Sequence, residues 1–223
     1  QFKLTVKPRA ASQPLSFVND VLPILSKAGC NAGSCHAKPD GQNGFKLSVF
    51  TYDPESDWRE IVEDARGRRV FPALPKESLI VKKATLAIPH EGGQRIRPGS
   101  ESERVLLQWI RDGMIFQREQ EPVLERVSVL PAVRVYRRKQ SQRLIVQAHY
   151  SDGSVRDVTG LTALASHDGE VAAVDDFLRR TLVVQQYRPN LAAQPADADR
   201  VIVRFDLAKK VLLLARNDRL PEP

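Results

Sequence analysis

The two cysteines of the chain lie close together, and a histidine directly follows the second, in the stretch Cys30-Asn31-Ala32-Gly33-Ser34-Cys35-His36. Two thiols followed by a histidine are typical of covalent haem attachment, usually with two residues between the cysteines. The thiols of such a site add to the porphyrin vinyl groups, and the histidine binds the iron. Here four small or turn-tolerant residues intervene, and they can bulge outward while both sulfurs reach one ring. The stretch predicts one haem c held by Cys30 and Cys35, with His36 on the iron.

Two other uses of these residues are open from their spacing alone. In an oxidising compartment, Cys30 and Cys35 could form a disulfide. With His36 and a second histidine they could also bind zinc. Adjacent Cys35 and His36 side chains would, however, have difficulty reaching one small tetrahedral ion.

A second histidine, His90, stands in a loop just before a helix that we predict to begin at Ser100. Ser100 and Glu103 have the spacing of a capping box at its first turn. In class I cytochromes c, the sixth iron ligand comes from a loop in this position. We therefore predict bis-histidine ligation by His36 and His90. The alternatives are Met114, which follows the helix, and an open or water-bound iron.

Arg95 and Arg97 follow His90 closely and can each form two parallel hydrogen bonds with a carboxylate. We predict that they bind the haem propionates; the alternative is that they are solvated surface charges. The sequence contains no evident acid–base constellation for catalysis. We therefore do not expect an enzyme, unless the haem has an open sixth position where peroxide or a small gas could bind.

Local patterns predict how the haem-binding stretch is positioned. Phe17, Val21 and Ile24 fall on one helical stripe that leads into the first cysteine, with Ser16 as the N-cap. Pro23 should kink this helix or end its first half. Asp53 and the proline after it predict another helix start, and residues 75–83 predict a short helix.

After residue 125 the hydrophobic period changes from that of helices to that of strands. Leu144, Val146, Ala148 and Tyr150 alternate with polar residues, and a series of short segments with this character runs to residue 214. A charged stretch lies between the two parts. We therefore predict a c-type cytochrome domain in residues 1–120 and an all-β domain in residues 121–223.

The composition narrows the possible partners. The 223 residues carry a formal net charge of +7, which would attract an acidic redox partner or an anionic polymer; the alternative is a solvated basic surface without a partner. Nucleic acid is not expected, since Arg and Lys are scattered and few aromatic residues offer stacking surfaces. No apolar run approaches the length of a membrane span. Covalent haem is matured outside the cytoplasmic membrane, so we expect a periplasmic or otherwise exported protein.

Two matches to known families are carried by short motifs. Residues 17–113 resemble the planctomycetal cytochrome c domain; the matching stretches are Asp20-Val21-Leu22-Pro23-Ile24-Leu25, Ala28-Gly29-Cys30 to His36, Asn43-Gly44-Phe45-Lys46-Leu47, Gly67-Arg68-Arg69, Ser78-Leu79-Ile80 and Trp109-Ile110. Residues 127–205 resemble a bacterial immunoglobulin-like domain of group 2; the matching stretches are Val129-Leu130-Pro131, Ala148 to Ser154, Asp157-Val158-Thr159 and Val171-Ala172-Ala173-Val174-Asp175.

These resemblances imply a multidomain fold, with a mainly α class I cytochrome c-like domain followed by an all-β immunoglobulin-like sandwich. They imply an electron-transfer module of a larger exported protein, whose downstream domains would be further partners. In another interpretation, the all-β domain binds a glycan or a partner and the haem domain serves it.

Overall fold

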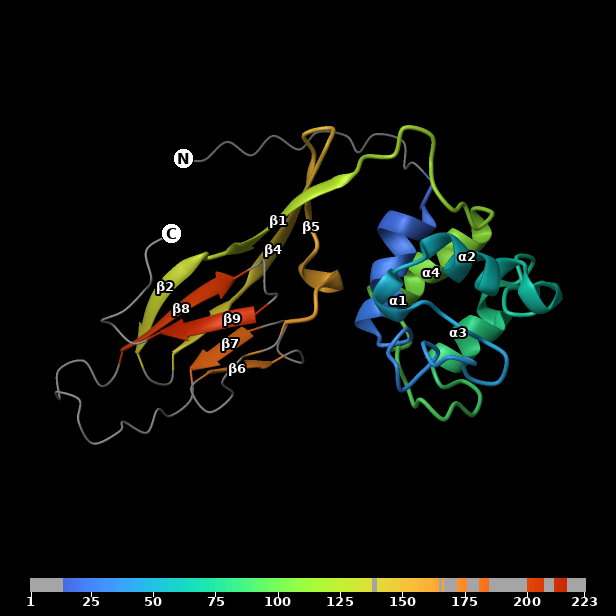
Figure 1. Ribbon diagram of the computed structural model, residues 1–223, viewed down its shortest axis with the longest axis horizontal. Coiled ribbons are helices and arrows are strands. Elements are labelled where there is room, and N and C mark those ends of the chain that lie inside the picture. Colours follow the sequence, from blue (N-terminus) through green and yellow to red (C-terminus); the bar gives the residue numbers. More distant parts are fainter. Residues whose placement is uncertain are drawn as a thin grey trace. The chain divides into compact units, whose positions relative to one another are not determined.

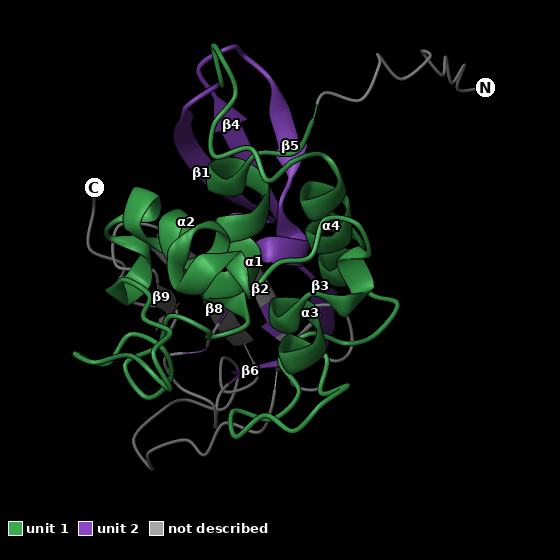
Figure 2. Cartoon of the chain, turned by 90° about the vertical axis from the view of Figure 1, so that its right-hand side faces the viewer, with its two compact units in different colours: residues 1–121 green, residues 122–223 purple. Residues whose placement is uncertain are grey.

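The structure is a computed structural model that describes residues 14–137, 140–164, 166, 172–175, 181–184, 200–206 and 211–215. The chain divides into two compact units, Gln1–Glu121 and Pro122–Pro223 (Figures 1 and 2). We describe each unit by itself.

Unit 1 contains the described helices longer than one turn, joined by irregular segments (Figure 1). In chain order it has a π-helical turn at Phe17–Val21, α1 at Leu22–Lys27, a 3₁₀ turn at Val49–Thr51, α2 at Pro54–Val62, 3₁₀ turns at Asp64–Gly67 and Pro75–Glu77, α3 at Leu79–Ala84 and α4 at Glu101–Arg111. No helix in the described part of the chain combines the length and the apolar character needed to cross a membrane.

The local signals for helix ends are confirmed. The Ser16 hydroxyl accepts a hydrogen bond from Asn19 N–H (3.2 Å), and Asp53 accepts one from Ser56 N–H (3.0 Å) at the start of α2. Pro23 lies in the first turn of α1, where its missing N–H costs no helical hydrogen bond. The helix predicted before the cysteines is thus a π-helical turn followed by α1, with the proline at the join.

The predicted class I cytochrome fold is wrong. The described helices are short: α1 and α3 have six residues each, and α4 has eleven. After α2 the backbone turns left-handed at Ala65 (φ 53°) and Arg66 (φ 61°), which breaks the helical path. Two adjacent left-handed residues that are not glycine carry no sequence signal, so the periodicity could not predict this break. The described part of unit 1 is an irregular arrangement with four short α-helices rather than a mainly α cytochrome fold.

The core of unit 1 forms where the first and last helical segments meet. Phe17 and Trp109 are fully buried, with ring centroids 5.6 Å apart. The N–H of Phe17 donates to the carbonyl oxygen of Ile115 (2.8 Å). The segment that follows α4 therefore lies beside the π-helical turn at the start of the described chain. These contacts fix α1, and with it the start of the cysteine stretch that follows.

Unit 2 contains three antiparallel sheets of three strands each among the described residues. The strands are β1 (Leu124–Leu130), β2 (Val133–Arg137), β3 (Ser141–Arg143), β4 (Ile145–Tyr150), β5 (Val155–Asp157), β6 (Ala172–Asp175), β7 (Thr181–Val184), β8 (Arg200–Asp206) and β9 (Val211–Ala215). The sheet orders are β1-β4-β5, β2-β8-β9 and β3-β7-β6. Val129, Tyr136, Leu144, Val146 and Ala172 form a buried cluster to which all three sheets or their connections contribute.

The predicted immunoglobulin-like sandwich is also wrong. Such a sandwich packs two antiparallel sheets face to face, whereas the described strands divide among three small sheets. The alternation of residues 144–150 does place Leu144, Val146 and Ala148 inside. Alternation decides which face of a strand is buried, but it does not decide which strands pair.

Asp57 gives a test of the packing around α2. Its buried carboxylate accepts hydrogen bonds from the N–H (2.5 Å) and the hydroxyl (2.8 Å) of Ser48, which hold residue 48 against the helix. Asp57→Ala should lower the free energy of unfolding by about 1–3 kcal/mol, because the partly buried N–H and hydroxyl of Ser48 lose their acceptor. Asp57→Asn retains an acceptor and should lose less. Urea unfolding followed by the fluorescence of Trp58 and Trp109 measures both variants; equal stability of the two would contradict this packing.

The same residue predicts a pH dependence. Burial raises the pKa of Asp57 above its ordinary value of 3.8, against the opposing hydrogen bonds from Ser48. At a pH between the ordinary pKa of Asp57, which applies to the unfolded state, and its higher pKa in the folded state, the folded state binds more protons. The free energy of unfolding therefore falls as pH rises through this window. Unfolding of the wild type and of Asp57→Asn from pH 3 upward should therefore show a stability decrease in the wild type that the variant lacks.

Candidate functional site

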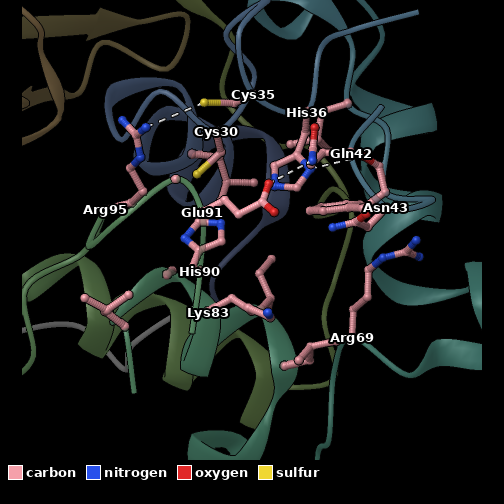
Figure 3. A pocket seen from close by; sticks show the side chains of 18 of the residues that line it. Cys30, Cys35, His36, Gln42, Asn43, Arg69, Lys83, His90, Glu91 and Arg95 are labelled. Atoms are coloured by element: carbon pink, nitrogen blue, oxygen red, sulfur yellow. Dashed lines mark hydrogen bonds between the residues drawn. The ribbon is translucent and has the colours of Figure 1, made fainter. Parts of the chain in front are cut away.

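A cavity of about 1040 Å³ lies in unit 1, and the residues predicted to bind haem gather on its walls. Cys30, Cys35 and His36 line it from the segment after α1, and His90 and Arg95 line it from the segment after α3 (Figure 3). Arg97 is exposed and is not among the lining residues, and neither is Met114. The structure therefore brings five of the six predicted site residues to one cavity.

The segment that carries the cysteines folds into a compact turn. The N–H of Cys30 donates to Leu25 O at the end of α1 (3.0 Å), and the N–H of His36 donates back to Cys30 O (3.1 Å). Within the turn, Cys35 N–H donates to Ala32 O (2.8 Å). The intervening residues thus loop out and bring the two cysteines to the same side. The left-handed glycine of this region is Gly29 (φ 74°), directly before the first cysteine.

The two imidazoles are held in the same way. Nδ1 of His36 lies 3.1 Å from the carbonyl oxygen of Phe45, and Nδ1 of His90 lies 2.9 Å from that of Gly93. Because a carbonyl oxygen only accepts, each Nδ1 carries a proton, and in the neutral imidazole Nε2 is then the nitrogen with the lone pair. Metal-binding histidines usually show this arrangement, in which one nitrogen donates to a carbonyl and the other binds the metal.

The rings also stand in a defined relation to each other. The centroids of the His36 and His90 rings are 6.4 Å apart, and the ring planes make an angle of 10°. Burial lowers the pKa of His36, which favours the neutral imidazole that a metal requires. Both side chains are half-buried, and Figure 3 shows them on facing parts of the cavity wall.

Both thiols are free in the structure. Burial raises the pKa of the Cys30 thiol to about 11, so this thiol is protonated near neutral pH. Nη2 of Arg95 lies 3.6 Å from Sγ of Cys35, and Figure 3 shows this guanidinium at the cysteine end of the cavity. Arg95, predicted to bind a propionate, therefore lies next to the thiols.

The zinc alternative finds no support in the described residues. They contain no group of three or more His, Cys, Asp or Glu side chains placed to hold a metal ion. Two imidazoles alone do not complete a tetrahedral site. A haem supplies four of the nitrogen ligands of its iron itself, so it would need from the chain only two side chains such as His36 and His90.

Several further residues shape this cavity, and no sequence pattern identified them as site residues. Phe45 and Arg69 stand beside His36: the rings of His36 and Phe45 are 4.4 Å apart, and the Arg69 guanidinium lies 4.7 Å from the Phe45 centroid. Gln42 donates to Glu91 (3.1 Å), which joins the segments of the two histidines. Phe45 and Arg69 occur in the motifs that resemble the cytochrome family, but those motifs do not reveal what the residues contact.

In unit 2, His149 contacts a serine in a way that excludes a catalytic pair. Its Nδ1 lies 3.0 Å from Nη2 of Arg126, and its Nε2 lies 2.9 Å from the hydroxyl of Ser128. A guanidinium only donates, so Nδ1 accepts and Nε2 carries the proton. The imidazole therefore cannot take a proton from the Ser128 hydroxyl, as activation of a nucleophile would require.

No protein-family model matches the chain, and neither a curated protein nor a solved structure matches it significantly. The likeness to planctomycetal cytochrome c therefore stands on the motifs quoted from the sequence, and the case for a function stands on the cavity.

Proposed function

We propose that this chain is an exported electron-transfer protein that binds one haem covalently through Cys30 and Cys35, with His36 and His90 as the axial ligands. The observation that carries the proposal is the convergence of two free thiols and two imidazoles, each imidazole held by its Nδ1, on one cavity. The proposal depends on this local arrangement and not on a cytochrome fold.

The dimensions of the site fit such a group. A histidine nitrogen lies about 2 Å from a first-row metal ion and the ring centre roughly 1 Å farther, so two imidazoles on opposite sides of one metal have centroids about 6 Å apart. The observed separation is 6.4 Å. The cavity volume of about 1040 Å³ lies just above the usual range for ligand and cofactor pockets, which is about 300–1,000 Å³.

The haem iron, when bound, supplies the exchange of one electron between its ferric and ferrous states. The side chains of this chain hold and surround that group. Cys30 and Cys35 would hold it covalently, while His36 and His90 would bind it through Nε2. The carbonyl oxygens of Phe45 and Gly93 accept from Nδ1 of the two histidines, which favours the Nδ1–H tautomer and increases the basicity of Nε2.

An acidic redox protein is the proposed partner. The chain has a net charge of +7, and Lys38, Arg68, Lys83 and Arg95 are among the residues that line the cavity. Positive charge near the redox group would speed encounter with a negatively charged protein, and this effect should weaken as salt is added. Reduction rates measured against ionic strength with an acidic and a basic donor protein test this part of the proposal.

The function itself is tested by the oxidised and reduced spectra of the full chain, with a potentiometric titration. We expect low-spin spectra in both states, one reversible one-electron transition, and a potential below that of a His/Met cytochrome, because imidazole donates to ferric iron better than a thioether does. Carbon monoxide binding to the reduced wild type would instead favour the alternative of an open sixth site, with small-ligand or peroxide chemistry.

Gly92 provides a specific test of the His90 position. A Cβ atom at Gly92 would lie 2.9 Å from Cε1 and 3.3 Å from Nε2 of His90, so Gly92→Ala must displace the imidazole. We expect part of the ferric haem to become high-spin in this variant. The matched control is Gly33→Ala, since a Cβ at Gly33 has no neighbour within 4 Å among the described residues. Identical spectra of the two variants would contradict the placement of His90.

A further inference from the structure

Arg69 is a buried cation that the roles assigned so far do not explain. Only 3% of the residue is exposed. Its Nη1 donates to the carbonyl oxygens of Glu60 and of Asp64 (3.2 Å), and its Nη2 donates to that of Gly44 (2.5 Å). The carboxylate of Glu60, 3.6 Å away, supplies an opposite charge. A buried guanidinium is tolerated when its donors are satisfied in this way, and a lysine could not match the forked geometry.

The contacts of Arg69 lead to His36 through one residue. The guanidinium fixes the Gly44 carbonyl and lies over the ring of the next residue, Phe45, 4.7 Å from its centroid. Phe45 in turn contacts His36 twice: its ring centroid is 4.4 Å from that of the imidazole, and its carbonyl oxygen is 3.1 Å from Nδ1. Arg69 thus holds both the backbone and the ring of the residue that orients His36.

The segment between these contacts has little freedom of its own. Gln42 and Phe45 form a two-way backbone bridge, with N···O distances of 2.9 and 3.1 Å. A Cβ atom at Gly41 would lie 2.4 Å from the carbonyl oxygen of Phe45, so the turn closes tightly there. A shift of Gly44 and Phe45 caused by loss of the guanidinium would therefore pass to the acceptor of His36 rather than be absorbed in the loop.

We propose that Arg69 is a positioning residue that sets the orientation of the His36 imidazole through Phe45, and thereby the 10° angle between the two ligand planes. This inference rests on the proposed haem function. A merely structural arginine would change the stability of unit 1 and leave the ligand orientation as it is.

The test compares Arg69→Lys with Arg66→Lys in the full chain. Arg66 is an exposed arginine of the neighbouring turn and does not line the cavity, so it is a matched control with the same change. Intact mass first determines whether haem is attached, which tests the proposed function alone. If haem is present, the ferric electron paramagnetic resonance spectrum reports the angle between the ligand planes.

With haem bound, nearly parallel planes should give a rhombic low-spin signal in the wild type. Arg69→Lys should shift its g values or divide it into two species, while Arg66→Lys leaves it unchanged. In protein without haem, long-range ¹H–¹⁵N spectra report which imidazole nitrogen carries the proton. His36 should be the Nδ1–H tautomer in the wild type and in Arg66→Lys, and a mixture in Arg69→Lys.

A folded Arg69→Lys protein with wild-type signals, in whichever form it is obtained, overturns the inference. Should Arg69→Lys fail to fold, Phe45→Leu decides, since it keeps the backbone acceptor and removes the ring between guanidinium and imidazole. Phe45→Leu should produce the same kind of shift with a smaller loss of stability. Unchanged signals in that variant would mean that the Phe45 ring does not pass the position of Arg69 to His36, and would overturn the inference as proposed.

Discussion

Replacing His90 with alanine is expected to convert the ferric haem from low-spin to high-spin and to allow carbon monoxide to bind the ferrous form. His90 is the imidazole that faces His36 in the cavity, with a centroid separation of 6.4 Å and its Nδ1 held by Gly93 O. Without it, the described lining residues offer no second imidazole. The covalent attachment should be unaffected, because the cysteines lie on another segment, so the intact mass should still include one haem.

The matched control is His149→Ala, which removes a histidine of unit 2 and should leave the spectrum unchanged. His90→Met should raise the potential if the thioether reaches the iron. An unchanged low-spin spectrum in His90→Ala would refute the assignment. Lys83 would then be the next residue to test, because it lines the cavity, whereas Met114 does not.

Removing both cysteines is expected to abolish covalent attachment. In Cys30→Ala/Cys35→Ala, the haem should become extractable by acid–acetone, and the intact mass should be that of the polypeptide alone. His36 and His90 remain, so non-covalent haem can still give a low-spin spectrum. Each single variant should keep one thioether and stay resistant to extraction, since either thiol lies on the wall of the same cavity.

Ser34→Ala serves as the control within the same turn, because it removes a hydroxyl next to Cys35 and no thiol. It should retain full covalent haem. If the haem of the double-cysteine variant still resists extraction, another side chain forms the covalent bond. The assignment of both cysteines as attachment residues would then be wrong.

The features that the sequence predicts well are those that adjacent residues determine. Ser16 and Asp53 cap helices because their side chains reach N–H groups three residues on, and Pro23 fits a first helical turn whatever surrounds it. The turn that contains Cys30, Cys35 and His36 is likewise held by hydrogen bonds between residues close in the sequence. His90 could be placed only by analogy with class I cytochromes, and although that fold is wrong, His90 does line the cavity.

The features that failed depend on contacts between distant segments. The class I fold requires long helices, but the backbone turns left-handed at Ala65 and Arg66. Neither residue is a glycine, so the sequence does not indicate this turn. In unit 2, alternation identified the inward face of β4 but could not assign strands to three sheets. Arg69 was missed because its acceptors come from three positions, Gly44, Glu60 and Asp64, which only the folded chain brings together.

Covalent haem attachment through Cys30 and Cys35 can be measured by the intact mass of the full chain, produced in cells that mature c-type cytochromes, together with its absorption spectrum. We expect a mass greater than that of the polypeptide by one haem, a Soret band, and no loss of colour on acid–acetone extraction. A mass lower than that of the polypeptide by two hydrogen atoms, with no Soret band, would identify a Cys30–Cys35 disulfide and contradict the proposed haem attachment.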